Sequence, residues 1–264
     1  MRIAGVVRIA GVVRTAAATA VCSVLLTSLA SCGFGDGSGV RKDGRGGREG
    51  ADGTDARATD LRRIPDVGDR LQSRIPRDSR QVVAVYGRSR NLPDATVVLY
   101  TRAAAGAGGK TATWKRERSW PAHNGKRGWA LDHRENDKRS PVGVFTLSDA
   151  GGVLADPDPS RGSGLPYTES SSFQAPRYWP KTHWHDFDHV IAIDYNRVKG
   201  TPPNDPTRPQ GQAKGGSIWL HMDHGGGTSG CVSLSKSGMR YLLRTLDPKQ
   251  HPVVVMGDKA ALRD

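Results

Sequence analysis

Residues 221–234 read HMDHGGGTSGCVSL, a stretch with two histidines, three consecutive glycines and Cys231. A strand-like run, SIWLH, leads into this stretch, and a second one, CVSL, ends it. Side chains alternate between the two faces of a strand, so His221 and Cys231 each point away from their aliphatic neighbours. If those aliphatic side chains face the core, the histidine and the cysteine emerge together on the other face. Directly paired strand neighbours have Cβ atoms about 4.5–5.5 Å apart, which suits an imidazole that takes a thiol proton.

Further strand-like runs extend outward from this stretch, rich in β-branched residues or alternating, and separated by Gly, Pro and Asn. They cover residues 81–86, 95–101, 111–120, 142–147, 189–195, 217–221, 231–234 and 251–256. One helix is predicted, because Met239, Leu242, Leu243 and Leu246 recur at helical spacing before Asp247-Pro248. The pattern predicts a mostly β domain (a β-rich α+β fold) over residues 81–258, with one main helix after Cys231 and a short tail at 259–264.

The amino-terminal 31 residues have the features of an export signal. Three arginines precede a charge-free apolar run from Thr15 to Ala30, which is too short to span a bilayer comfortably. The run ends in Leu29-Ala30-Ser31-Cys32, which resembles the bacterial lipobox, where signal cleavage exposes a cysteine whose sulfur carries diacylglycerol. We therefore expect a lipoprotein signal peptide at 1–31 and a mature chain held by acyl chains on Cys32 at the outer face of the cytoplasmic membrane. An ordinary secretory signal followed by a chance cysteine is the alternative.

Residues 32–80 are predicted to form a flexible tether, rich in glycine and charge. Positions 33–80 hold 11 Lys and Arg against 9 Asp and Glu and few large apolar residues. The remainder, from residue 81, has 25 Lys and Arg against 17 Asp and Glu, a net charge of +8. Such a surface favours anionic surroundings such as cell-wall polymer or acidic lipid. Nucleic acid is not an expected partner of an exported, lipid-anchored chain.

The three cysteines have different expected fates. Cys22 leaves with the signal peptide and Cys32 carries lipid, so Cys231 has no disulfide partner in an oxidising compartment. The residues alone leave two possibilities, namely a small buried apolar side chain or a nucleophile.

At this point the chain resembles the L,D-transpeptidases with a YkuD-type catalytic domain. His221 matches the strand-end histidine of that family, and Thr228-Ser229-Gly230-Cys231-Val232 matches its cysteine motif. Ser140-Pro141-Val142-Gly143-Val144-Phe145 matches an upstream element. Ser229 replaces a histidine of the motif, Met222 replaces a glycine, and the loop is short, as in a divergent branch of the family.

The resemblance implies a YkuD-like β-sandwich or barrel and a cysteine acyltransferase that acts on peptidoglycan stem peptides as a monomer, without a cofactor or metal. Cys231 would be the nucleophile and His221 its base. Backbone N–H groups around Gly230 and Cys231 would stabilise the oxyanion, with Thr228, Ser229 and His224 in support. A backbone carbonyl near Met222 would hold the imidazole tautomer.

Two other functions remain open on the sequence. The first is a zinc peptidase of the cell wall, because the segment HWHDFDH offers His183, His185, His189, Asp186 and Asp188, and the stretch 221–224 could contribute further ligands. The second is a non-catalytic wall-binding lipoprotein, in which Cys231 is inert and the six tryptophans serve as sugar platforms or as packing.

Overall fold

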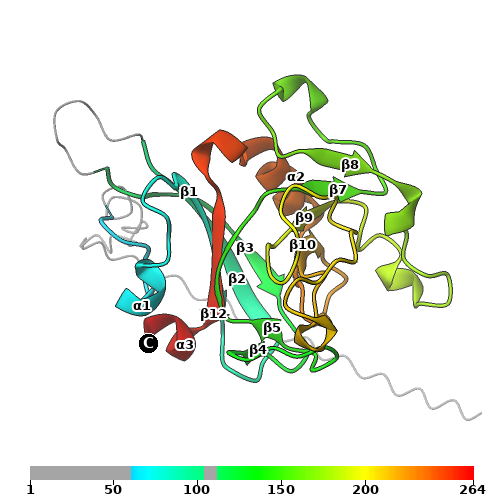
Figure 1. Ribbon diagram of the computed structural model, residues 1–264, viewed down its shortest axis with the longest axis horizontal. Coiled ribbons are helices and arrows are strands. Elements are labelled where there is room, and N and C mark those ends of the chain that lie inside the picture. Colours follow the sequence, from blue (N-terminus) through cyan, green and yellow to red (C-terminus); the bar gives the residue numbers. More distant parts are fainter. Residues whose placement is uncertain (1–60, 104–111) are drawn as a thin grey trace, which may run out of the picture. The chain divides into compact units, whose positions relative to one another are not determined.

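The computed structural model describes residues 61–103 and 112–264 (Figure 1). The predicted signal peptide, the lipidation site Cys32 and the predicted tether up to residue 60 lie outside the described residues.

The described chain is mostly β, built around one curled sheet of ten strands in the order β6-β12-β1-β2-β3-β11-β10-β9-β7-β8. The strands of this sheet are β1 Gln81–Gly87, β2 Asp94–Thr101, β3 Lys115–His123, β6 Gly143–Thr146, β7 Ala150–Gly152, β8 Tyr167–Glu169, β9 Val190–Ala192, β10 Trp219–Met222, β11 Val232–Leu234 and β12 Val253–Asp258. A separate pair joins β4 Trp129–Ala130 to β5 Ser140–Pro141. The predicted β-rich fold is therefore confirmed, and each strand-like run contributes a strand, although the run at 189–195 is a strand only over β9.

Three α-helices and five 3-10 turns complete the described part. The helices are α1 Asp69–Gln72, α2 Lys236–Thr245 and α3 Lys259–Arg263, and the 3-10 turns are η1 Pro159–Arg161, η2 Ser171–Phe173, η3 Lys181–His183, η4 Gln212–Lys214 and η5 Pro248–Gln250. Helix α2 is the predicted main helix, and the Ser235 hydroxyl caps it by accepting the Gly238 N–H at 3.2 Å. No helix among the residues that the structure covers is long and apolar enough to cross a bilayer.

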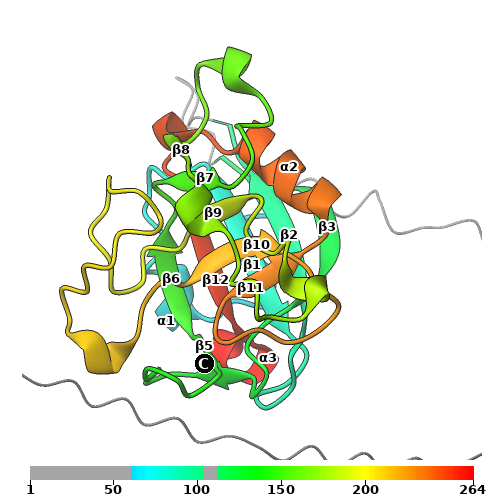
Figure 2. The ribbon, with the colours of Figure 1, turned by 90° about the vertical axis from the view of Figure 1, so that its right-hand side faces the viewer.

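Strand β1 lies between two hydrophobic cores, so both faces of the sheet are covered there. It pairs in parallel with β12 and antiparallel with β2, and its side chains are buried on both sides. Val83 and Val85 face the larger core, which includes Met239 and Leu242 of α2, whereas Val82 and Ala84 face a second core. Figure 2 shows α2 far from α1 and α3, which lie at the other end of the fold. A continuous run of apolar residues is typical of a strand buried on both faces.

The second core contains residues from the predicted tether and the predicted tail, so the predicted boundaries of these two segments are wrong. Ile64, Val67, Leu71 and Ile75 are buried there together with Leu262 of α3, and the Gly68 N–H donates to the Leu262 carbonyl at 2.8 Å. Residues 61–80 therefore belong to the folded unit, and residues 259–263 form a packed helix. The physical reason is that a few well-spaced apolar residues in a polar tract can cover the apolar face of a sheet that is built elsewhere in the chain.

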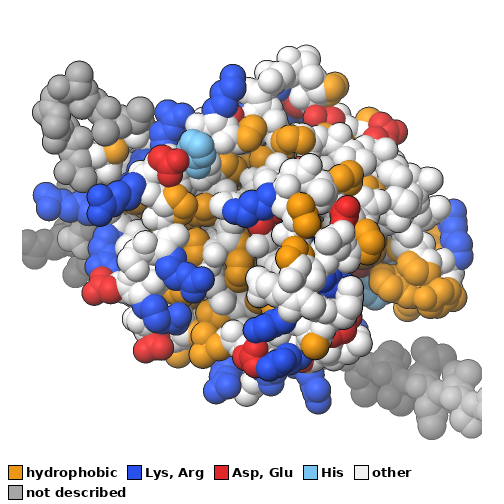
Figure 3. Space-filling model, in the orientation of Figure 1, with side chains coloured by type: hydrophobic (Ala, Val, Ile, Leu, Met, Phe, Trp, Pro, Cys, Tyr) orange, Lys and Arg blue, Asp and Glu red, His pale blue; other side chains and the backbone are white. Residues whose placement is uncertain are grey.

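On the face that Figure 3 shows, the charged side chains of the described part are distributed rather than gathered. Figure 3 shows Lys and Arg side chains spread over the visible face, with Asp and Glu side chains among them. The excess of positive charge on residues 81–264 therefore forms no single patch on this face.

Candidate active site

Strands β10 and β11 bring Cys231 and His221 to the same face of the sheet. The two strands are parallel, and Leu220 pairs with Val232 while His221 pairs with Ser233. Cys231 directly precedes β11, so it lies two residues before Ser233, which is paired with His221. The prediction that both side chains share a face is thus met, but they are diagonal rather than direct neighbours. No hydrogen bond joins the Cys231 thiol to the imidazole in the described structure.

The glycine-rich loop joins these two strands, and hydrogen bonds to residues outside the loop hold it in place. The Thr228 N–H donates to the Asn124 carbonyl at 2.9 Å, and the Lys126 N–H donates to the Thr228 carbonyl at 2.8 Å. Residues 124–126 follow β3, which pairs with β11. The loop that delivers Cys231 is therefore anchored to a neighbouring strand end.

His221 is buried, with 3% of the residue exposed, and its tautomer is set by the main chain. Its Nδ1 atom lies 2.8 Å from the carbonyl oxygen of Met222, which can only accept, so Nδ1 carries the proton and Nε2 carries the lone pair. Burial lowers the pKa of His221, because the charged imidazolium loses its hydration. The result is a neutral imidazole with a free basic nitrogen at neutral pH.

The thiol of Cys231 is held by main-chain groups. Sγ accepts the Trp219 N–H at 3.4 Å and lies 3.5 Å from the Ser217 carbonyl, to which the S–H can donate. Burial raises the pKa of Cys231 to about 11, the Trp219 N–H opposes this rise, and the charge of Asp186 adds to it. The resting cysteine is therefore a thiol, and it needs a base to become a nucleophile.

The residues before Cys231 form a tight, internally bonded turn. Gly230 has φ +149°, and a Cβ there would lie 3.0 Å from the Arg139 carbonyl oxygen, so only glycine fits without strain. The Gly230 N–H donates to the Thr228 hydroxyl at 3.1 Å, and that hydroxyl donates to the Cys231 carbonyl at 2.6 Å. The Gly230 N–H is thus already engaged. The hydrogen bonds of the described loops leave the N–H groups of Ser229 and Cys231 unused, so these are the better candidates for oxyanion donors.

Ser140 supports the same turn and is a residue whose role the sequence reasoning missed. Its buried hydroxyl donates to the Gly230 carbonyl at 2.7 Å and accepts the Gly125 N–H at 2.9 Å. The upstream element that begins with Ser140 therefore contacts the cysteine turn directly. The resemblance to a family motif was the only signal that pointed to this segment.

Asp223 is a second residue whose structural role the sequence did not indicate. Its Oδ1 atom accepts the Ser233 hydroxyl at 2.6 Å and lies 2.7 Å from Nδ1 of His123, so one carboxylate links the start of the loop to β11 and β3. Burial alone would raise the pKa of Asp223, but the hydrogen bonds from Ser233 and His123 outweigh it and lower this pKa. The ends of the strands that carry His221 and Cys231 are thereby tied together.

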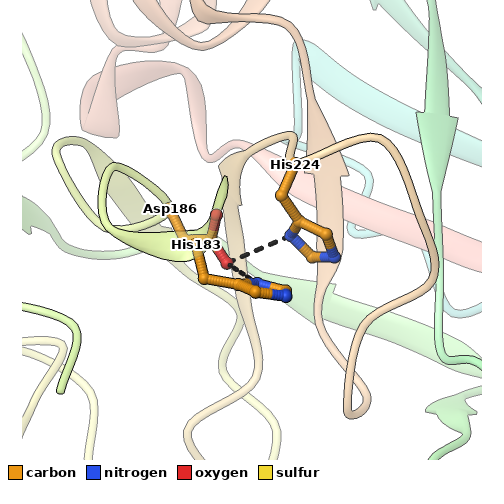
Figure 4. A group of neighbouring side chains, drawn as sticks. All are labelled: His183, Asp186 and His224. Carbon is orange, nitrogen blue, oxygen red and sulfur yellow. Dashed lines mark hydrogen bonds and ion pairs between the residues drawn. The ribbon is translucent and has the colours of Figure 1, made fainter. Parts of the chain in front are cut away.

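His224 lies beside His221 but has a different environment. The two rings stack with centroids 6.2 Å apart and planes 14° apart. Nδ1 of His224 lies 3.0 Å from Oδ2 of Asp186, and this carboxylate raises the pKa of His224. Nδ1 of His183 lies 2.9 Å from the same oxygen (Figure 4). His224 therefore belongs to a carboxylate-centred cluster, whereas His221 has only a backbone acceptor.

The remaining histidines of HWHDFDH do not join this cluster. Nδ1 of His185 lies 3.1 Å from Asp188, and His185 is largely exposed. Nδ1 of His189 lies 3.0 Å from the Tyr167 hydroxyl. A His-x-His pair that converges on one ion, as the zinc-peptidase alternative needs, is therefore not formed.

The thiol, the His221 imidazole and the carboxylate-centred cluster line one pocket of about 330 Å³. Cys231 and His221 line it together with Thr228 and Ser229 of the cysteine motif, and the His183–Asp186–His224 cluster forms another part of its wall. Trp179, Pro180 and Phe187 give it apolar walls, and Lys126 supplies a positive charge. A thiol, a neutral imidazole and nearby backbone donors in one pocket can carry out acyl transfer. Of the predicted supporting residues, Met222 contributes its carbonyl, while its side chain is in the core.

Comparison with known proteins gives one family. A family model described as the L,D-transpeptidase catalytic domain, YkuD, matches residues 91–255. No curated protein and no solved structure matches the chain. The matched segment contains β10, β11, the cysteine turn and the Ser140 element. Because it covers more than half of the 264 residues, the chain belongs to the L,D-transpeptidase catalytic-domain family, YkuD.

Proposed function

We propose that this protein is a peptidoglycan L,D-transpeptidase that works through a thioester on Cys231. The YkuD family acts on peptidoglycan stem peptides. The observation that carries the proposal for this chain is the shared pocket of the Cys231 thiol and of His221, whose Nδ1 is bonded to the Met222 carbonyl at 2.8 Å.

The first half of the reaction transfers an acyl group to sulfur. Nε2 of His221 takes the Cys231 proton as the sulfur attacks the carbonyl carbon that precedes the terminal D-residue of a stem tetrapeptide. The tetrahedral oxyanion is stabilised by the N–H groups of Ser229 and Cys231. The C–N bond then breaks, the departing amine takes the proton from the His221 imidazolium, and a thioester remains on Cys231.

The second half transfers the acyl group to an acceptor. A side-chain amine of a second stem attacks the thioester carbonyl and loses a proton to His221, and the C–S bond breaks to return the thiol. A water molecule in the place of the amine gives a trimmed stem, that is, L,D-carboxypeptidase activity. The Lys126 side chain is a suitable partner for a stem carboxylate at the pocket.

The test is product analysis with purified stem tetrapeptides. Wild-type protein should release the terminal D-residue and form cross-linked dimers, and Cys231→Ala should do neither. Trimmed stems without dimers would assign the carboxypeptidase reaction alone. Release at the wild-type rate by Cys231→Ala would contradict the proposal.

We further propose that the protein works at the outer face of the cytoplasmic membrane, anchored by lipid on Cys32. The support is the apolar leader and Leu29-Ala30-Ser31-Cys32. In detergent phase separation, the mature wild-type protein should enter the detergent phase and Cys32→Ala should stay in the aqueous phase. Aqueous partitioning of both proteins would contradict the anchor.

A further inference from the structure

Three side chains outside the thiol–imidazole pair converge on one point of the pocket wall. Oδ2 of Asp186 lies 2.9 Å from Nδ1 of His183 and 3.0 Å from Nδ1 of His224. One ligand atom from each residue lies within 4.8 Å of the others. Figure 4 shows the two imidazoles directed at the carboxylate from separate segments of the chain.

Two of the three side chains are almost fully buried, that of His183 is 23% exposed, and one nitrogen atom of the cluster lacks a hydrogen bond. The side chain of Asp186 is 4% exposed and that of His224 is 7% exposed. Although Nδ1 of His224 is close to the carboxylate, it is a buried atom without a well-aligned hydrogen-bond partner among the described residues. A buried polar atom in this state lacks the hydrogen bonds that it makes in water, so its environment is better suited to a further ligand.

We propose that His183, Asp186 and His224 form a binding site for a divalent transition-metal ion of the zinc type. Zinc takes imidazole nitrogen and carboxylate oxygen at about 2.0–2.2 Å, so tetrahedral ligand atoms lie roughly 3.4 Å apart. The two nitrogen–oxygen separations of 2.9 and 3.0 Å need to widen by a few tenths of an ångström, and the ligand atoms, which lie within 4.8 Å of one another, need to draw together around the ion. Both imidazoles would offer the Nδ1 lone pair and keep their proton on Nε2. Two nitrogen ligands favour zinc over magnesium or calcium.

The site differs from the zinc peptidase considered from the sequence. It contains neither His185 nor His189, and its three protein ligands leave a fourth position for a ligand from the pocket. The same pocket is lined by Cys231 and His221, so an ion there would share space with an incoming substrate. The proposal concerns binding and does not depend on the proposed acyl transfer.

Calorimetric titration of the full chain with Zn²⁺ tests the site, with Mg²⁺ as the comparison ion. We expect one Zn²⁺ per chain and no comparable binding of Mg²⁺. Asp186→Asn and His224→Ala should each weaken Zn²⁺ binding by at least about tenfold, because even the loss of an outer-shell partner of a metal site costs about 10–100-fold. Thermal melting without metal shows whether each variant is folded.

Two control variants separate this ligand set from others. His185→Ala removes an exposed histidine of the same segment, and Cys231→Ala removes the thiol of the same pocket. Both should bind Zn²⁺ as the wild type does. Absence of saturable binding, unchanged binding by Asp186→Asn, or loss of binding in Cys231→Ala would each overturn the proposal.

Cobalt binding to the wild-type protein tests the site without a variant, so the test remains informative if a variant fails to fold. Co²⁺ bound to the wild-type protein by two nitrogen atoms and an oxygen should show tetrahedral d–d absorption without a sulfur-to-cobalt charge-transfer band. A charge-transfer band would place Cys231 among the ligands and contradict the site as proposed.

Discussion

Nδ1 of His221 lies 2.8 Å from the carbonyl oxygen of Met222, the next residue in the chain. The orientation of the imidazole thus depends on the main chain and not on a neighbouring side chain. A methionine side chain is compatible with this role, because the Met222 side chain enters the core while its carbonyl orients the imidazole. The two histidines therefore differ in the group beside Nδ1, which is a backbone carbonyl for His221 and the Asp186 carboxylate for His224.

The first prediction distinguishes these two histidines. His221→Ala should reduce the rate of Cys231 acylation by about 10²–10⁴-fold, the usual contribution of a general base. His224→Ala, the matched control from the same loop, should retain most of this rate. The measurement is single-turnover acylation of both variants. Loss of acylation in His224→Ala with a normal rate in His221→Ala would place the base in the loop.

The second prediction concerns pH. Burial lowers the pKa of His221, so the neutral base is present through neutral pH and the rate of acylation should fall only on acidification below about pH 6.5. The pKa of Cys231 is raised to about 11, so in His221→Ala the rate should keep rising into the alkaline range as the thiol ionises unaided. Rate profiles of wild type and His221→Ala test this. A wild-type profile that rises only near the thiol pKa would show that His221 does not assist.

The third prediction concerns the support of the cysteine turn. Ser140→Ala removes a buried hydroxyl that bonds the Gly230 carbonyl and the Gly125 N–H, so the free energy of unfolding should fall by about 1–3 kcal/mol and acylation should slow. Ser160→Ala, in an exposed turn, is the control. Denaturant unfolding and acylation rates are the measurements. Equal stability of the two variants would show that Ser140 does not hold the turn.

Much of the β fold was predictable because its strands have recognisable patterns in the local sequence. The runs at 81–86 and 251–256 are continuous and β-branched, and each became a strand buried on both faces. The prediction of a flexible tether is wrong for residues 61–80, because their few apolar residues are buried in the second core. The spacing of Ile64, Val67, Leu71 and Ile75 was the available signal, but Pro65 and Gly68 interrupt it and only Asp69–Gln72 is helical.

Part of the site was also predictable from local sequence patterns. Alternation alone placed His221 and Cys231 on one face, but it could not supply the register of two parallel strands, which sets the diagonal offset. Asp186 and His183 reach the pocket from a loop more than thirty residues earlier in the chain. No local pattern relates such a loop to β10, so their proximity to His224 needed the structure.

The fourth prediction tests the corrected domain boundary. Leu71 is fully buried in the second core, so Leu71→Ala should lower the free energy of unfolding by about 2–5 kcal/mol. Arg74→Ala, an exposed change in the same segment, should be close to neutral. Denaturant unfolding of both variants is the measurement. A neutral Leu71→Ala would mean that residues 61–80 contribute nothing to the folded unit.

The fifth prediction is the covalent intermediate itself, detected by intact-protein and peptide mass spectrometry after brief exposure to a stem tetrapeptide without an acceptor amine. The protein should gain the mass of the tetrapeptide less its terminal D-residue, on the peptide that contains Cys231, and Cys231→Ala should gain nothing. Release of the D-residue with no adduct on Cys231, or an unchanged rate of release by Cys231→Ala, would contradict the thioester account.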